Sequence, residues 1–183
     1  MLLLEALERE GEAQRLLLAG EAKAAAPVFR EVAALYRRSW EEAHAGAYGR
    51  LAGMIKAAIL AGDGEEEAEF VRGEIESADS PSSAYPLALA ALVAGDDGVA
   101  AEAARAMREG GEGFDRAAEA VEALAAGDAE RYALAVEAIV RDFEAREEHL
   151  TGVAIADTAV VFERLAERRG IAAHPKSALS PQR

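Results

Sequence analysis

The chain contains no cysteine among its 183 residues. Disulfide bonds, thiolate chemistry and cysteine-based metal sites are therefore excluded. Aromatic residues make up only 5% of the sequence, and the β-branched residues are too scattered to give the alternating pattern that predicts strands. These absences argue against a β-rich fold and against a disulfide-stabilised scaffold.

Long apolar runs are also absent. The segment Met1-Leu2-Leu3-Leu4 is followed at once by Glu5, so the apolar region of a secretory signal is missing. No run reaches the length of about 18 apolar residues that a membrane-spanning helix needs. We therefore expect a cytoplasmic protein that does not enter a membrane.

Basic residues are few, because 34 Asp and Glu stand against 20 Lys and Arg and give a formal net charge of −14. This balance argues against nucleic-acid binding, which needs clustered bases to displace counterions, and against binding to an anionic membrane surface. It suits a basic protein partner or a cationic ligand, although an acidic surface also serves solubility alone. Arg outnumbers Lys by 17 to 3, which is typical of a GC-rich bacterial or archaeal genome.

The residues that are abundant, chiefly Ala, Leu and Glu, are strong helix formers and predict an all-α fold.

Four short stretches divide the sequence, and each is an apolar run that ends in Ala-Gly followed by an acid. Their glycines are Gly20, Gly62, Gly95 and Gly127, with spacings of 42, 33 and 32 residues. These spacings fall in the range of helical repeats, and each glycine is expected to end a helix at a hairpin corner.

The apolar periodicity predicts about nine helices, arranged as four antiparallel hairpins and a capping helix in a right-handed array. The expected helices span residues 2–19, 21–43, 45–61, 65–78, 83–94, 99–109, 114–126, 128–148 and 153–169. Ser82 or Ser83 is expected to cap the fifth helix. Residues 1–170 then form a single helical-repeat domain, and residues 171–183 form an extended or partly disordered C-terminal tail.

The segment from Gly20 to Ala33 has an acid after the corner glycine, several small alanines and Phe29 at helical spacing. It resembles the second half of a tetratricopeptide repeat (TPR). The resemblance implies a TPR-like array without strict consensus, acting as a non-enzymatic protein-interaction or scaffold module. Such a module would bind a protein or peptide in the groove formed by its successive first helices.

Two alternative functions remain open from the sequence. Residues 152–157, 165–171 and 177–181 resemble the closing segment of a helical toxin-immunity family, which implies a protein that neutralises a bacterial toxin, and the acidic charge would suit a basic nuclease toxin. The other alternative is a small-molecule-binding or enzymatic protein that uses the glycine-rich third helix. Gly46, Gly49 and Gly53 lie in that helix, where a ligand could lie against exposed backbone, or where a neighbouring helix could approach closely.

Aromatic and basic residues gather between Phe29 and Lys56, a segment that holds the only Trp and two of the four Tyr. Aromatic residues and arginine are the usual anchors of binding hot spots. The candidate binding residues are Tyr36, Arg37, Trp40, Tyr48 and Arg50. The alternative interpretation is that Tyr36 and Trp40 are core residues, while the arginines offset neighbouring glutamates.

The three histidines do not assemble a catalytic or metal-binding pattern. Glu41 and His44 match one Glu-x-x-His unit of a di-iron bundle, but a second unit is missing because Arg146 occupies the slot three residues before His149. His44 and His149 are interpreted as helix-end residues, and His174 lies in the tail without an evident partner. No nucleophile elbow, P-loop or dinucleotide-binding fingerprint is present.

The sequence therefore predicts no catalytic residue, no metal site and no cofactor, and we expect a protein that is not an enzyme. A protein or peptide partner is expected instead. The alanine-rich faces and the uncovered first hairpin also suggest a homodimer.

Overall fold

The computed structural model describes residues 1–181, and this range contains nine α-helices, one short 3-10 turn and no β-strand. The all-α prediction is confirmed. Residues 182 and 183 of the predicted tail lie outside the described residues. The helices are α1 (Leu2–Leu18), α2 (Ala22–Glu41), α3 (Gly49–Ala61), α4 (Glu65–Glu74), α5 (Pro81–Ala94), α6 (Asp97–Met107), α7 (Glu112–Ala126), α8 (Ala129–Glu144) and α9 (Asp157–Arg169).

Each of the four corner glycines separates two consecutive helices. Gly62, Gly95 and Gly127 end α3, α5 and α7 in the left-handed conformation, with φ angles of 93°, 74° and 66°. Gly20 follows α1 with a φ angle of 80°. A Cβ atom would be strained in this conformation, so glycine determines where these helices end.

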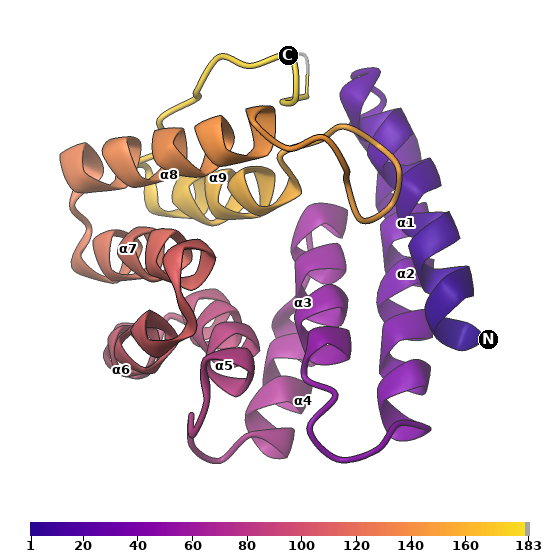
Figure 1. Cartoon of the computed structure of the whole chain (residues 1–183), viewed down its shortest axis with the longest axis horizontal. Coiled ribbons are helices and arrows are strands. Elements are labelled where there is room, and N and C mark those ends of the chain that lie inside the picture. The colour runs from indigo at the N-terminus through magenta and orange to yellow at the C-terminus, as the bar shows by residue number, and fades with distance from the viewer. Residues whose placement is uncertain (182–183) are drawn as a thin grey trace.

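Successive helices pack side by side, and the chain follows an arc (Figure 1). α2 lies between α1 and α3, and each helix from α4 to α7 packs against the next one along the chain. α5 also contacts α3 and α7. α3 packs far more extensively along α2 than along α4.

The end of the chain returns to its beginning. α9 packs against α3, α7 and α8, and the loop of residues 145–156 reaches α1 (Figure 1). In this loop the hydroxyl of Thr151 donates a hydrogen bond to Oε1 of Gln14. The faces of α3 and α7 that meet α9 are therefore covered by the chain itself.

The core consists mainly of small side chains, which allow the helices to approach closely. α5 lies at its centre, because the nine residues 83, 84 and 86–92 of this helix are all buried. Larger side chains such as Phe29, Tyr132 and Phe162 pack in other parts of the core and are fully buried. Burial of such apolar surface contributes about 25 cal/mol per Å² to folding.

The start of α5 differs from the predicted one because a capping box places it two residues earlier. The hydroxyl of Ser80 accepts a hydrogen bond from the backbone N–H of Ser83 at 3.2 Å, and the hydroxyl of Ser83 accepts one from the N–H of Ser80 at 3.2 Å. Ser80 is thus the N-cap, and Pro81 takes the first helical position, where it needs no hydrogen bond. The prediction of Ser82 or Ser83 as the cap was wrong.

α8 ends at Glu144, so His149 is not a helix-end residue as predicted but lies in the loop that follows. Its ring stacks on Phe143 with 6.3 Å between the centroids. The guanidinium of Arg146 lies 3.8 Å from the centre of the same ring. The chain after Glu144 thus packs back onto Phe143 and does not continue the helix to its predicted end.

Residues 171–181 contain no helix and run along α8 and α9 (Figure 1). The carbonyl of Leu179 accepts a hydrogen bond from the N–H of Ala156 at 2.9 Å, and the hydroxyl of Ser177 donates one to Glu144 at 2.7 Å. His174 has a partner that the sequence did not reveal, since its Nδ1 lies 3.1 Å from a carboxylate oxygen of Glu163. Several polar contacts therefore hold this part of the tail on the helices.

Candidate functional site

Three of the five candidate residues, Arg37, Trp40 and Tyr48, lie at a surface between α2 and α4. Trp40 and Tyr48 stack with 5.7 Å between their ring centroids and 30° between their planes. The guanidinium of Arg37 lies 4.1 Å from the centre of the Phe70 ring, which is a cation–π contact. We call these four partly buried residues the α2–α4 aromatic surface.

Carboxylates border this surface. The indole Nε1 of Trp40 donates a hydrogen bond to Glu74 at 2.9 Å, and Arg37 forms ion pairs with Glu66 at 3.2 Å and with Glu41 at 3.7 Å. The side chain of Glu66 is 81% exposed, so most of this carboxylate faces solvent. The contacts tie α2 to α4 and fix the orientation of the aromatic side chains.

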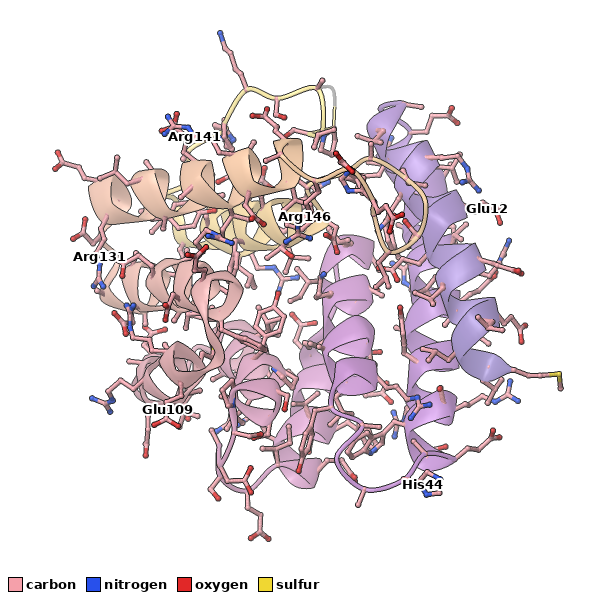
Figure 2. The ribbon with its side chains drawn as sticks, in the orientation of Figure 1. Glu12, His44, Glu109, Arg131, Arg141 and Arg146 are labelled. Atoms are coloured by element: carbon pink, nitrogen blue, oxygen red, sulfur yellow. The ribbon has the colours of Figure 1, made fainter. Side chains whose placement is uncertain are left out.

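The negative charge of this region comes chiefly from α4. Glu65, Glu66 and Glu67 occupy its first turn, where anions favour the positive end of the helix. Glu69 follows on the exposed surface. Arg72, the basic residue near the end of α4, forms an ion pair with Asp96 at 2.8 Å. Other acidic and basic side chains, such as Glu12, Glu109, Arg131 and Arg141 in Figure 2, lie on other parts of the molecular surface.

Tyr36 is a core residue and does not belong to this surface. It is 3% exposed, and its hydroxyl donates a hydrogen bond to Glu10 at 2.7 Å. Burial and the neighbouring Glu10 carboxylate raise the pKa of the Tyr36 hydroxyl well above its usual value. The hydroxyl is therefore a hydrogen-bond donor at any physiological pH.

Arg50 is also separate from the α2–α4 aromatic surface. It lies in the first turn of α3 and is partly buried. Its Nε atom is buried, and no acceptor within residues 1–181 forms a hydrogen bond with it. The structure thus places two of the five candidate residues elsewhere.

The three glycines that the sequence assigned to the third helix have different surroundings, and Gly46 lies in the turn before α3 with a φ angle of 89°. A Cβ atom on Gly53 would lie only 2.6 Å from the ring of Tyr36, whereas one on Gly49 or Gly46 would meet no atom within 4 Å. Gly53 therefore allows the Tyr36 ring to pack directly on the backbone of α3. The ring covers the side of the Gly53 backbone that would carry a side chain, whereas Gly46 and Gly49 are exposed.

A buried polar network joins the two ends of the chain. Glu10 and Gln14 are only 5% and 2% exposed, and Lys56 of α3 forms an ion pair with Asp157 of α9. Burial raises the pKa of Glu10, while the charge of Lys56 and the hydrogen bond from Tyr36 act in the opposite direction. Hydrogen bonds join Glu10 to Tyr36 and to Gln14, and the charges of Lys56 and Asp157 act on Glu10, so the network links α1, α2, α3 and α9.

Sequence reasoning missed this network, although α1 carried a signal for it. The apolar stripe of α1 passes through Ala6, Ala13 and Leu17 at helical spacing, and Glu10 and Gln14 fall on the same buried face. Two polar residues at core positions predict buried hydrogen-bonding partners. Their partners in α2 and in the loop after α8 could not be identified from local pattern.

Within residues 1–181, no group of three or more His, Asp or Glu side chains is placed to hold a metal ion. No helix in the described part of the chain is long and apolar enough to cross a membrane. Comparison of the chain with protein-family models, with curated proteins and with solved structures gave no match.

Proposed function

We propose that the chain is a cytoplasmic, non-enzymatic protein-interaction module of the TPR-like helical-hairpin type, and that it binds a basic segment of a partner protein. The α2–α4 aromatic surface is the proposed contact. The observation that carries the proposal is the stack of Trp40 on Tyr48, on the same surface as Arg37 and its exposed partner carboxylate Glu66.

Chemistry and rigidity both support this assignment. Trp, Tyr and Arg are the residue types that dominate binding hot spots, and here the Trp40 indole is fixed by its hydrogen bond to Glu74. A side chain that is already held in place loses little conformational entropy when a partner binds. The acidic border would attract Lys and Arg side chains, and the net charge of −14 would speed their encounter with the surface.

The only Trp of the chain lies at the proposed contact, so its fluorescence reports binding there. We expect Lys- and Arg-rich peptides from a synthetic array to change this fluorescence and to bind more weakly as salt is added. Matched Asp- and Glu-rich peptides should not bind. Glu66→Lys should weaken binding of the basic peptides at least about tenfold, whereas Glu102→Lys on the exposed surface of α6 should have little effect.

Circular dichroism checks that both variants fold, because loss of the exposed Arg37–Glu66 pair costs at most about 1 kcal/mol. Equal binding of basic and acidic peptides would refute the proposal, as would binding that is unchanged in Glu66→Lys. Light scattering on the same preparations tests the homodimer that the sequence suggests.

The acidic helix α4 also suits the toxin-immunity alternative. Four glutamates, Glu65, Glu66, Glu67 and Glu69, lie within five consecutive residues of α4, and such a surface would suit a basic toxin. Immunity would require a stable complex with one folded basic protein, whereas a scaffold would bind short segments of several partners. Genes adjacent to that of this chain therefore separate the two hypotheses most directly.

A further inference from the structure

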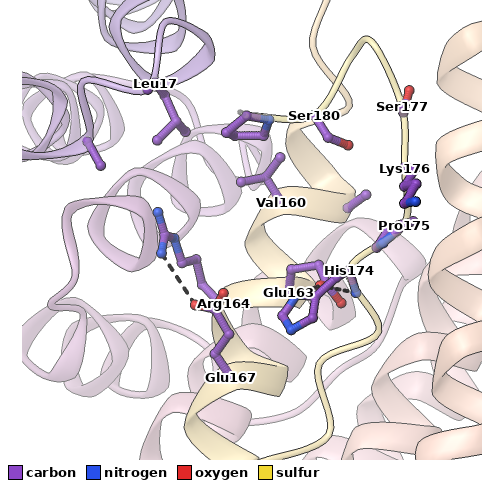
Figure 3. Close-up of a pocket in the computed structure, with 14 residues that line it drawn as sticks. Leu17, Val160, Glu163, Arg164, Glu167, His174, Pro175, Lys176, Ser177 and Ser180 are labelled. Atoms are coloured by element: carbon purple, nitrogen blue, oxygen red, sulfur yellow. Dashed lines mark hydrogen bonds and ion pairs between the residues drawn. The ribbon is translucent and has the colours of Figure 1, made fainter. Parts of the chain in front are cut away.

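A groove lies between the corner of α1 and α2, one face of α9 and the C-terminal tail (Figure 3). Its volume is about 450 Å³, which falls in the range of small-molecule sites. Leu17, Ala159 and Val160 form an apolar wall, and Pro175 and Pro181 of the tail also line the groove. We call this feature the tail groove, and it is formed by other residues than the α2–α4 aromatic surface.

The tail side of the groove is held in place by Glu163. Its carboxylate accepts hydrogen bonds from the hydroxyl of Tyr132 at 2.7 Å, the N–H of Ala173 at 3.1 Å and the N–H of His174 at 2.7 Å. The imidazole Nδ1 of His174 lies 3.1 Å from the same carboxylate. These contacts stabilise His174 in a left-handed conformation with a φ angle of 55°, which is uncommon for a residue other than glycine.

Because Glu163 already accepts this set of donors, the lone pairs of its carboxylate are largely occupied by the tail and by Tyr132. The other acid of the groove, Glu167, contacts Arg164, with 3.3 Å between Oε2 and Nη1. This is the one contact of the Arg164 guanidinium with an acceptor in residues 1–181. A guanidinium carries five N–H donors, so Arg164 retains donors for a further acceptor.

A second cation, Lys176, also lines the groove and is exposed. No ion pair joins it to an acid in the described part of the chain. Figure 3 shows Arg164 and Lys176 on opposite sides of Val160. Two cations that flank an apolar wall, in a chain with a net charge of −14, are suited to a ligand with a negative head group and an apolar body.

We propose that the tail groove binds a small organic carboxylate with an apolar body. Its carboxylate accepts hydrogen bonds from Arg164, in the charge-assisted geometry that guanidinium and carboxylate groups favour, and Lys176 adds positive potential from the opposite side. The apolar body lies against Leu17 and Val160. This inference does not depend on the proposed protein-interaction function, because no residue of the tail groove belongs to the α2–α4 aromatic surface.

Octanoate, octylammonium and octanol are suitable probes, because they share one apolar chain and differ in the charge of the head group. Isothermal titration calorimetry with the full chain, at probe concentrations below micelle formation, is expected to detect octanoate binding alone. Arg164→Gln should weaken octanoate binding at least about tenfold. Arg105→Gln, which changes an exposed arginine of α6 away from the groove, should leave it unchanged.

A steric test uses two alanines of the first turns of α2. Ala22 is exposed and lines the groove, whereas Ala24 is exposed and does not line it. Ala22→Trp should abolish octanoate binding, and Ala24→Trp should preserve it. The proposal is overturned if octanoate does not bind, if octanol or octylammonium binds as tightly, or if Arg164→Gln and Ala22→Trp both bind octanoate like the unmodified chain.

Discussion

The hydroxyl of Tyr36 donates a hydrogen bond to Oε2 of Glu10 across 2.7 Å, and neither residue is more than 5% exposed. This bond crosses from α2 to α1 inside the buried network that also contains Lys56 and Asp157. A buried polar group that loses its partner costs about 1–3 kcal/mol. The network should therefore dominate the response of this fold to pH and to single substitutions.

Stability should depend on pH through Glu10. Burial raises the pKa of its carboxyl above the ordinary value of 4.5, so the folded chain binds a proton more tightly than the unfolded chain. The free energy of unfolding should therefore fall as the pH rises from 4.5 through the higher pKa of the folded state. Urea unfolding between pH 4.5 and pH 8 should show this loss relative to Glu10→Gln.

Glu8→Gln is the matched control, because Glu8 is an exposed residue of the same helix. It should leave the pH profile of the unmodified chain in place. Parallel profiles for the unmodified chain and Glu10→Gln would contradict the role of Glu10.

Alanine at Gly53 and at Gly49 should have opposite effects. A Cβ at Gly53 would lie 2.6 Å from the Tyr36 ring, and overpacking of this kind costs about 1–3 kcal/mol. A Cβ at Gly49 would meet no atom within 4 Å. Gly49→Ala should therefore stabilise α3 by up to about 1 kcal/mol, because alanine favours helices. Thermal unfolding of both variants tests the pair, and equal melting temperatures would show that the close approach at Gly53 has no energetic weight.

Removal of one partner of the Lys56–Asp157 ion pair should destabilise the fold more than removal of both partners. Their side chains are 15% and 17% exposed, so Lys56→Met leaves a poorly solvated carboxylate and should cost about 3 kcal/mol. The double variant Lys56→Met and Asp157→Leu should lose less than Lys56→Met alone, since no charge remains unpaired. Chemical unfolding of the single and double variants measures this coupling, and additive losses would refute it.

Glu163→Gln should loosen the C-terminal tail. The amide nitrogen of Gln cannot accept hydrogen bonds, so donors from Tyr132, Ala173 or His174 lose their acceptor, at a cost of about 1–3 kcal/mol. Amide hydrogen exchange at Ala173 and His174 should accelerate by at least about tenfold, since 1.4 kcal/mol corresponds to that factor. Glu130→Gln, at an exposed position of α8, is the control, and unchanged exchange in Glu163→Gln would show that other contacts hold the tail.

Local sequence determined the helices and their corners. Ala, Leu and Glu favour helix wherever they gather, and Gly20, Gly62, Gly95 and Gly127 stop it because only glycine takes the left-handed conformation without strain. The start of α5 at Ser80 was missed because Ser80, Ser82 and Ser83 are all suitable caps in isolation. The hydrogen bonds of Ser83 decide among them.

Tertiary structure alone decided where the candidate residues face. Tyr36 and Trp40 lie four residues apart on α2, yet Tyr36 meets Glu10 of α1 and Trp40 meets Glu74 of α4. Lys56 and Asp157 are 101 residues apart in the sequence. A periodic pattern identifies the buried face of one helix, but it does not identify the helix that covers that face. The partners follow from the arc that brings α9 back to α3, because only the packing of the whole chain fixes distances between remote side chains.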